Sequence, residues 1–408
     1  MPQNRGAGGS GPARPQGAVR IPRHDASDRP FIVIWEATQA CPLACRHCRA
    51  SARPWRDVGE LSTDQATELM VQVAAFGEPP PLFVITGGDP FQRPDLMRLV
   101  RRGTELGLPM SVSPSGTPTL TRPALAALHE AGARAVSLSL DAAAPATHDA
   151  FRGVDGVYAV TTRAWRDAID LGLKVQINTT VTRDNVADLP RIAAQVRDRG
   201  ALLWSVFFLV PTGRGRRLHE LDAQQTEDVL HLLYDIGLTV PVKTTEAHHF
   251  RRVYLQRTIL ERRGVAAGQV LNLGPLYHRL RRELDELGLL RAARRARRPP
   301  LQVSAGNGFV FVSHRGDVHP SGFLPVAAGN VRHQRLADIY RTAPMFTALR
   351  DPGRLGGRCG ACEFRTVCGG SRARAYAVTA DMYAEEPACV YQPGSFPFPD
   401  DLAALVPA

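Results

Sequence analysis

The sequence predicts an α/β protein, arranged as a partial (βα)6 TIM-like barrel with a small C-terminal α+β domain. Three observations support this prediction. Short runs with the composition of β-strands alternate with helical patterns between residues 31 and 240, as parallel βα units do. Polar motifs directly follow these runs. All the cysteines fall into two groups, one after the first run and one near the C-terminus.

Six strands are expected in the barrel, with helices between them. The strands are expected at Phe31–Ala37, Leu82–Thr86, Pro109–Ser113, Ala135–Leu140, Val175–Val181 and Leu203–Val210. Helical patterns include Thr63–Phe76, Asp95–Leu106 and Asn185–Arg197. A chain of 408 residues is long enough for a barrel-sized core and a smaller appendage.

Polar motifs stand where each predicted strand ends, which is where barrel enzymes place their chemistry. In chain order they are Cys41–Cys48, Gly87–Pro90, Ser115–Thr117, Ser139 with Asp141, Asn178 with Thr180, and Pro211–Gly215. Six motifs on one face of the barrel predict a single site. The simpler alternative for Ser139, Asp141, Asn178 and Thr180 is that they only form hydrogen bonds at the strand ends.

The segments outside the barrel differ in composition. Residues 1–30 are rich in Gly, Pro and Arg and are expected to form a disordered lead. The barrel is expected over residues 31–240, and a helical, basic connector over 241–300. Residues 301–397 are expected to form the C-terminal domain, opening with a β-hairpin that turns at His314–Asp317. Residues 398–408 are expected to be a tail.

The net charge of +11 is concentrated in two segments. Residues 251–300 contain thirteen Arg and four acidic residues, and residues 1–30 contain five Arg and two Asp. Such a local excess favours a solvated helix face, with capture of an acidic substrate as an alternative. Nucleic-acid binding is the least favoured of the three interpretations.

The two cysteine groups differ in the number of ligands that they offer. The first cysteine group is Cys41, Cys45 and Cys48, and the second is Cys359, Cys362, Cys368 and Cys389. Three thiolates leave a four-coordinate metal or a four-iron cluster open, whereas four thiolates can close the site. The chain has no signal-peptide pattern and no apolar run of membrane-spanning length, so we expect a cytoplasmic protein with no membrane partner. In that reducing compartment, cysteine groups bind metals more often than they form disulfides.

Zinc is the alternative occupant of both groups. At the first group it would need His47 as a fourth ligand, but His47 and Cys48 are adjacent and would have difficulty ligating one ion. At the second group, spacing alone also suits a structural zinc ion.

Three of these motifs together resemble the radical S-adenosylmethionine (SAM) superfamily. They are Cys-Pro-Leu-Ala-Cys-Arg-His-Cys at residues 41–48, Gly-Gly-Asp-Pro at 87–90, and Ser-Leu-Ser-Leu-Asp at 137–141 with Phe-Arg-Gly at 151–153. The resemblance spans residues 31–215. It implies that the first cysteine group holds a [4Fe-4S] cluster whose open iron is chelated by SAM. One electron then cleaves SAM to methionine and a 5′-deoxyadenosyl radical, which abstracts hydrogen from the substrate.

The resemblance also implies SAM contacts in the barrel. Gly87, Gly88 and Asp89 would contact the methionine amino group, although the family usually has Glu at the position of Asp89. Ser139 and Arg152 would contact the ribose and the carboxylate, and His47 would lie near the adenine. The strand-end residues Ser115 and Asn178 complete the expected cofactor-binding set.

The second cysteine group and its flanking sequence resemble the SPASM or twitch extension of the same superfamily. The extension binds an auxiliary [4Fe-4S] cluster through four cysteines, so two [4Fe-4S] clusters are expected in all. Full versions carry a further cysteine where this chain has Ser321, and this favours one auxiliary cluster. A cluster with four protein ligands is expected to pass electrons rather than to bind substrate.

Within the superfamily, the resemblance is greatest to enzymes that modify the propionate side chains of tetrapyrroles, in heme and heme d1 synthesis. Residues 246–252 would then supply cations and an axial-type His for the substrate. Two alternatives stay open: a SPASM-type maturase of a ribosomally made peptide, and a non-catalytic iron-sulfur redox protein. An electron donor such as ferredoxin or flavodoxin is expected as the partner.

Overall fold

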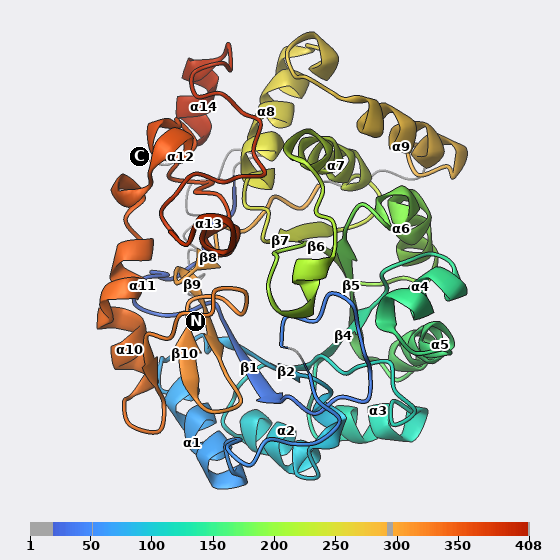
Figure 1. Ribbon diagram of the computed structural model, residues 1–408, viewed down its shortest axis with the longest axis vertical. Helices are drawn as coiled ribbons and strands as arrows, with labels where there is room; N and C mark the ends of the chain where they lie inside the picture. Colours follow the sequence, from blue (N-terminus) through green and yellow to red (C-terminus); the bar gives the residue numbers. More distant parts are fainter. Residues whose placement is uncertain (1–18, 51, 292–296, 407–408) are drawn as a thin grey trace, which may run out of the picture.

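The protein is described by a computed structural model that covers residues 19–50, 52–291 and 297–406 (Figure 1). Its main sheet contains eleven strands. The strands are β1 Ile32–Thr38, β2 Leu82–Gly87, β3 Met110–Val112, β4 Ala135–Ser139, β5 Lys174–Val181, β6 Leu203–Phe208, β7 Val242–Thr245, β8 Ser304–Ala305, β9 Gly308–Val312, β10 Asp317–His319 and β11 Gly329–Asn330.

Helices lie between and beyond the strands, and α1 to α6 lie outside the arc that the parallel strands form (Figure 1). The helices are α1 Thr63–Ala74, α2 Leu96–Glu105, α3 Arg122–Glu130, α4 Pro145–Arg152, α5 Val157–Asp170, α6 Leu189–Asp198, α7 Ala223–Ile236, α8 Phe250–Arg263, α9 Pro275–Glu286, α10 Leu336–Thr342, α11 Pro344–Leu349, α12 Gly357–Ala361, α13 Arg372–Thr379 and α14 Pro399–Leu405. The predicted α/β fold with six parallel barrel strands is confirmed.

Local sequence explains where these elements begin. The side chains of Ser62 and Gln65 form a reciprocal capping box at the start of α1, which satisfies two backbone N–H groups. Asp222 and Gln225 form the same motif at α7. Trp35 on β1, Trp204 on β6 and Trp165 on α5 are fully buried and join one continuous apolar core.

The sheet extends beyond the six predicted strands on both sides. β7 lies parallel to β6, pairing Trp204 with Val242, although this stretch was expected to be part of a helical connector. On the other side, β9 lies parallel to β1, pairing Ile32 with Phe309. The predicted hairpin is present as β9 and β10, and it is continuous with the barrel sheet rather than a separate sheet.

The two ends of the described chain pack on the second half of the molecule. Residues 19–30 were expected to be disordered, yet Val19 is buried and the Arg20 N–H donates to the carbonyl of Pro300 (2.9 Å). Residues 1–18 of that expected lead lie outside the described residues. The expected tail forms α14, which packs on α8 and buries Leu402 and Leu405.

Three arginines of α8, Arg251, Arg252 and Arg257, are buried, which departs from the expected solvated basic face, whereas Arg262 and Arg263 of the same helix are exposed as expected. The Arg252 guanidinium donates to both carboxylate oxygens of Glu227 on α7 (2.7 and 2.6 Å). Arg257 likewise pairs with Asp235 on α7 (2.5 Å). Arg251 donates to the Val367 carbonyl (3.0 Å). These arginines therefore join helices inside the protein and are not a free cationic surface.

We predict that Glu227→Gln destabilises the protein by about 3–5 kcal/mol at pH 7, because it leaves the buried Arg252 unpaired. Burial opposes ionisation of Glu227, but Arg252 holds its pKa well below the usual range. The ion pair therefore stabilises the fold above the ordinary Glu pKa and is lost as pH falls below it. Urea unfolding of both proteins, repeated at decreasing pH, measures the difference.

The matched control is Glu261→Gln. It removes the ion pair between Glu261 and Arg297, in which the Glu261 side chain is half exposed. We expect this change to cost less than about 1 kcal/mol. Equal losses in the two variants would contradict the importance of the Glu227–Arg252 pair.

Candidate functional site

The first cysteine group lies on the loop that follows β1. Cys41 and Cys45 are buried and Cys48 is half-buried. The loop is tied back to the chain by the Cys41 N–H, which donates to the Arg53 carbonyl (2.7 Å). The Cys48 N–H donates to the Cys45 carbonyl (3.3 Å), so the loop folds into a tight turn. This turn places the three thiols of the first cysteine group together at the carboxyl end of β1, as their spacing in the sequence predicted.

The loop after β6 presses on this cysteine loop. Gly213 has φ +54°, and a Cβ there would lie 2.4 Å from the Arg49 carbonyl oxygen. Next to it, the Arg214 N–H donates to the Cys48 carbonyl and its side-chain Nε donates to the Cys45 carbonyl (both 2.9 Å). The Pro211–Gly215 motif therefore holds the cysteine loop in place.

The Gly-Gly-Asp-Pro motif also approaches the cysteine loop through its backbone. A Cβ on Gly87 would lie 2.3 Å from the Thr38 carbonyl oxygen, and one on Gly88 would lie 2.4 Å from that of Ala40. Real Cβ atoms do not come this close, so both positions require glycine. The backbone of β2 thus ends directly beside the segment that leads into Cys41.

Asp89 takes a different role from the expected contact with SAM. Its carboxylate is fully buried and accepts hydrogen bonds from the Thr117 hydroxyl (2.9 Å) and the Phe91 N–H (3.3 Å). Burial raises the pKa of Asp89, although Thr117 opposes the rise. Its side chain organises the turn. Ser115 lies closer to the cysteines, with its hydroxyl donating to the Gly88 carbonyl (2.7 Å) and lying 3.7 Å from the Cys41 sulfur.

Arg152 is placed beside a cysteine ligand. Its guanidinium donates to the Cys45 sulfur (3.7 Å) and pairs with Asp141. The Asp141 carboxylate also accepts from the Thr180 N–H (2.8 Å). Arg152 is therefore oriented by a buried carboxylate rather than free to bind a ligand alone. Asp141 was predicted as a strand-end residue, but its pairing with Arg152 was not.

The remaining predicted residues, His47, Ser139 and Asn178, lie at two positions around the barrel mouth, the end at which the parallel strands finish. The His47 ring stacks on Phe151, with ring centres 4.8 Å apart and an angle of 19°. Burial lowers the pKa of His47 to about 4, so the ring is neutral at physiological pH. Ser139 and Asn178 face each other across neighbouring strands as register partners. The Asn178 amide oxygen accepts from the Gln176 side chain (2.7 Å).

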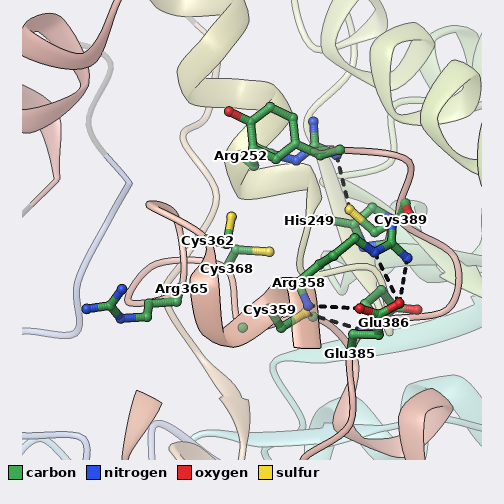
Figure 2. Close-up of a pocket in the computed structure, with 13 residues that line it drawn as sticks. His249, Arg252, Arg358, Cys359, Cys362, Arg365, Cys368, Glu385, Glu386 and Cys389 are labelled. Carbon is green, nitrogen blue, oxygen red and sulfur yellow. Dashed lines mark hydrogen bonds and ion pairs between the residues drawn. The ribbon is translucent and has the colours of Figure 1, made fainter. Parts of the chain in front are cut away.

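The second cysteine group lines one pocket, together with charged side chains (Figure 2). Arg252 donates to the Cys389 sulfur (3.8 Å), and the Glu386 N–H donates to the Cys359 sulfur (3.3 Å). Burial raises the pKa of Cys362 to about 11 and that of Cys368 to about 12. Thiols in such an environment become thiolates when a metal supplies the compensating positive charge.

The spacing of the possible ligand side chains bears on the choice between a single ion and a cluster. Within residues 19–50, 52–291 and 297–406, no group of three or more His, Cys, Asp or Glu side chains has the spacing of a single-ion site. Zn–S bonds of about 2.3 Å would draw four sulfurs around one point. A four-iron cluster instead binds each cysteine through a different iron, so its ligands stand farther apart.

A buried polar network joins the barrel mouth to this pocket, and the sequence did not predict it. Glu246 has φ +56° and accepts from the Ser321 hydroxyl (2.8 Å). Arg374 donates to the carbonyls of Glu246 (2.8 Å) and Leu209 (3.0 Å) and to the Glu386 carboxylate (3.2 Å). Arg374 lies in the run after Cys368, but nothing in that run indicates these distant partners.

The residues expected to reach a substrate from the start of α8 are buried. His249 is fully buried, and Arg251 and Arg252 are nearly so. His249 lines the second cysteine pocket, so it is not exposed as an axial ligand. The expectation for residues 246–252 is wrong for these side chains.

A parallel αβ barrel with an open three-cysteine loop after its first strand, facing a glycine turn after the second, defines an enzyme that carries an open iron-sulfur cluster. The family model "Radical SAM superfamily" matches residues 35–196. An AdoMet-dependent heme synthase of Oleidesulfovibrio alaskensis is 37% identical over 94% of this chain and 94% of its own length. A protein of the same name from Methanosarcina barkeri is 36% identical over 90% of this chain and 98% of its own.

The solved structure of SuiB from Streptococcus suis bound to S-adenosylmethionine has the same fold. It superposes with a TM-score of 0.64 at 16% identity, over 89% of this chain and 78% of that one. The chain belongs to the radical SAM superfamily, and it is an enzyme that uses SAM and a [4Fe-4S] cluster. No helix in the described part of the chain is long and apolar enough to cross a membrane.

The residues at the mouth fit these cofactors. Three thiols and no fourth cysteine of the chain lie on the loop after β1, which leaves one iron open. Nδ1 of His47 and one terminal nitrogen of Arg214 are buried without a hydrogen-bond partner among the described residues. Such atoms are the donors and acceptors that a bound nucleoside or carboxylate would satisfy.

We predict that Gly213→Ala disrupts the first cysteine group, because its Cβ would collide with the backbone of Arg49. The iron of the open cluster at the first cysteine group, about four per chain, should be lost. Iron analysis after anaerobic reconstitution measures this.

The control is Gly172→Ala. Gly172 has φ +84°, and a Cβ added there would have no atom of the described chain within 4 Å. It carries the same left-handed strain without the collision, so full iron content is expected. Equal iron loss in both variants would mean that strain alone, and not the close approach, is responsible.

Proposed function

We propose that this radical SAM enzyme acts on the propionate side chains of a tetrapyrrole, by oxidative decarboxylation or removal. The observation that carries this proposal is the similarity to heme synthases over about nine-tenths of the chain. When bound, SAM at the open cluster supplies the 5′-deoxyadenosyl radical that abstracts hydrogen.

The first cysteine group would hold the SAM-binding cluster, and the backbone of Gly87 and Gly88 would face the methionine amino group. His47, stacked on Phe151, would contact the adenine through its unpartnered Nδ1. Ser139, Asn178 and Ser115 line the same mouth. Arg152 would act mainly on the cluster, through its hydrogen bond to the Cys45 sulfur. Its contact with SAM would be a secondary role.

The substrate seat would lie between the first cysteine loop and the β9–β10 hairpin. Arg49, directly after Cys48, holds its guanidinium 4.4 Å from the ring centre of Phe311 and 5.9 Å from that of Phe323. Its carboxylate partner Glu36 lies 3.3 Å away. Aromatic faces suit a flat macrocycle, and a half-buried Arg suits a propionate. Arg49 is therefore a better candidate for binding a propionate than the arginines at the start of α8.

The second cysteine group would hold an auxiliary [4Fe-4S] cluster with four thiolate ligands. Because all four ligand positions are filled by the protein, its expected task is to exchange an electron with the substrate radical. Ser321, where full versions of the extension carry a cysteine, donates to Glu246 and is thus part of the protein network. A single auxiliary cluster is consistent with this arrangement.

The electron donor would dock beside the first cysteine loop. Arg46, Arg216 and Arg217 are exposed there, on the loop itself and on the segment that clamps it. Such a basic rim suits an acidic one-electron carrier such as ferredoxin or flavodoxin. Cluster-bound thiolates also need a reducing compartment, which supports a cytoplasmic location.

We predict that the anaerobically reconstituted protein, supplied with SAM and a one-electron reductant such as reduced flavodoxin, forms 5′-deoxyadenosine and releases carbon dioxide from iron-coproporphyrin. The Cys41, Cys45 and Cys48 triple Ala variant should form neither, and its iron should fall from about eight to about four per chain. Iron analysis and chromatography of the nucleoside and porphyrin make the measurement.

Nucleoside without any porphyrin change would contradict the tetrapyrrole substrate and direct the search to peptides. Zinc in both sites and no nucleoside would contradict the radical mechanism itself.

We further predict that Cys362→Ala separates the roles of the two sites. It should spare SAM cleavage, because the first cysteine group is intact, while stopping product formation. The ratio of 5′-deoxyadenosine to decarboxylated product, measured in the same reaction, tests this. A normal yield of product would show that the second site is only structural.

A further inference from the structure

His249 is a buried side chain in the wall of the second cysteine pocket with no protein partner. It stands directly before α8, is fully buried, and is drawn among the pocket-lining residues in Figure 2. Neither Nδ1 nor Nε2 has a hydrogen-bond partner within the described chain. Buried polar groups are costly when unpaired, so an unpaired imidazole in a pocket wall indicates a ligand group that the pocket receives.

Three other donors around the pocket are directed at the thiols. The Glu386 N–H points to the Cys359 sulfur (3.3 Å) and Arg372 to the same sulfur (3.9 Å). Arg252 points to the Cys389 sulfur and is held in place by Glu227. His249 thus extends an existing ring of donors, and its own acceptor would be an atom of whatever the four thiols hold.

We propose that His249 is a positioning residue that donates an imidazole N–H hydrogen bond to the auxiliary cluster and raises the reduction potential of that cluster. The proposal rests on the assignment of a cluster to the second cysteine group. Hydrogen bonds to cluster sulfurs stabilise the more negative, reduced state. An imidazole carries at least one N–H in either charge state, so the bond does not depend on protonation of the ring.

The test is an EPR-monitored redox titration of the two-cluster holoenzyme, with the auxiliary signal identified as the one that added SAM leaves unchanged. His249→Leu should disfavour reduction of that cluster at least tenfold, which is a fall of 59 mV for one electron. His249→Gln keeps an N–H donor and should restore a potential near that of the wild type. The matched control is His248→Leu, because His248 is the neighbouring residue and is not in the pocket wall.

An unchanged auxiliary potential in His249→Leu, with full iron content, would overturn the proposal. If that variant does not retain its cluster, the wild-type protein labelled with 15N-histidine provides the decision. A weak 15N coupling to the reduced auxiliary cluster, absent in His249→Gln, supports the hydrogen bond, and its absence in the wild type overturns it. Failure of the second cysteine group to bind four iron in the wild type would instead contradict the auxiliary cluster, which iron analysis detects separately.

Discussion

The position of the first cysteine loop depends on close contacts between backbone segments. These segments approach the loop so closely that a side chain at the contact point would not fit. Gly87 and Gly88 bring the end of β2 against the carbonyls of Thr38 and Ala40, and Gly213 brings the loop after β6 against that of Arg49. Gly153, which ends α4, leaves only 2.9 Å between an added Cβ and the carbonyl of Ala44. The thiols are therefore positioned from several sides by rigid elements, which is the preorganisation that an open cluster site requires.

The parts of the fold that follow local rules could be predicted. The expected strand Leu82–Thr86 matches β2 to within one residue, because a short apolar run followed by glycines is a local signal. β7 was missed because Val242–Thr245 is short and contains Lys243, so only its pairing with β6 makes it a strand. Cysteine spacing is a local pattern and predicted the two cysteine groups, whereas the hydrogen bonding of Asp89 depends on Thr117, a partner 28 residues away that no local pattern indicates.

The buried charges of α8 show why composition alone misplaced three arginines of the basic segment, Arg251, Arg252 and Arg257. A run of arginines at helix spacing has the same composition whether it faces water or an acidic helix. Here Glu227 and Asp235 of α7 face Arg252 and Arg257, with Tyr391 stacked 4.8 Å from the Arg252 guanidinium. Buried ion pairs contribute little net stability compared with apolar packing, but they fix orientation. Their effect is to hold one guanidinium beside Cys389.

Arg374 makes the two cofactor sites parts of one polar structure. Its guanidinium bonds to carbonyls at the ends of β6 and β7 and to the Glu386 carboxylate, and the backbone N–H of Glu386 bonds to the Cys359 sulfur. Glu246, whose backbone is in the left-handed region, accepts hydrogen bonds from the hydroxyls of Ser321 and Ser371. A shift at the barrel mouth would therefore move donors around the second thiol group. The proposed electron exchange would require both sites to keep a fixed geometry, and this buried network, rather than a flexible linker, would then be the connection between the radical-forming barrel and the second cysteine group.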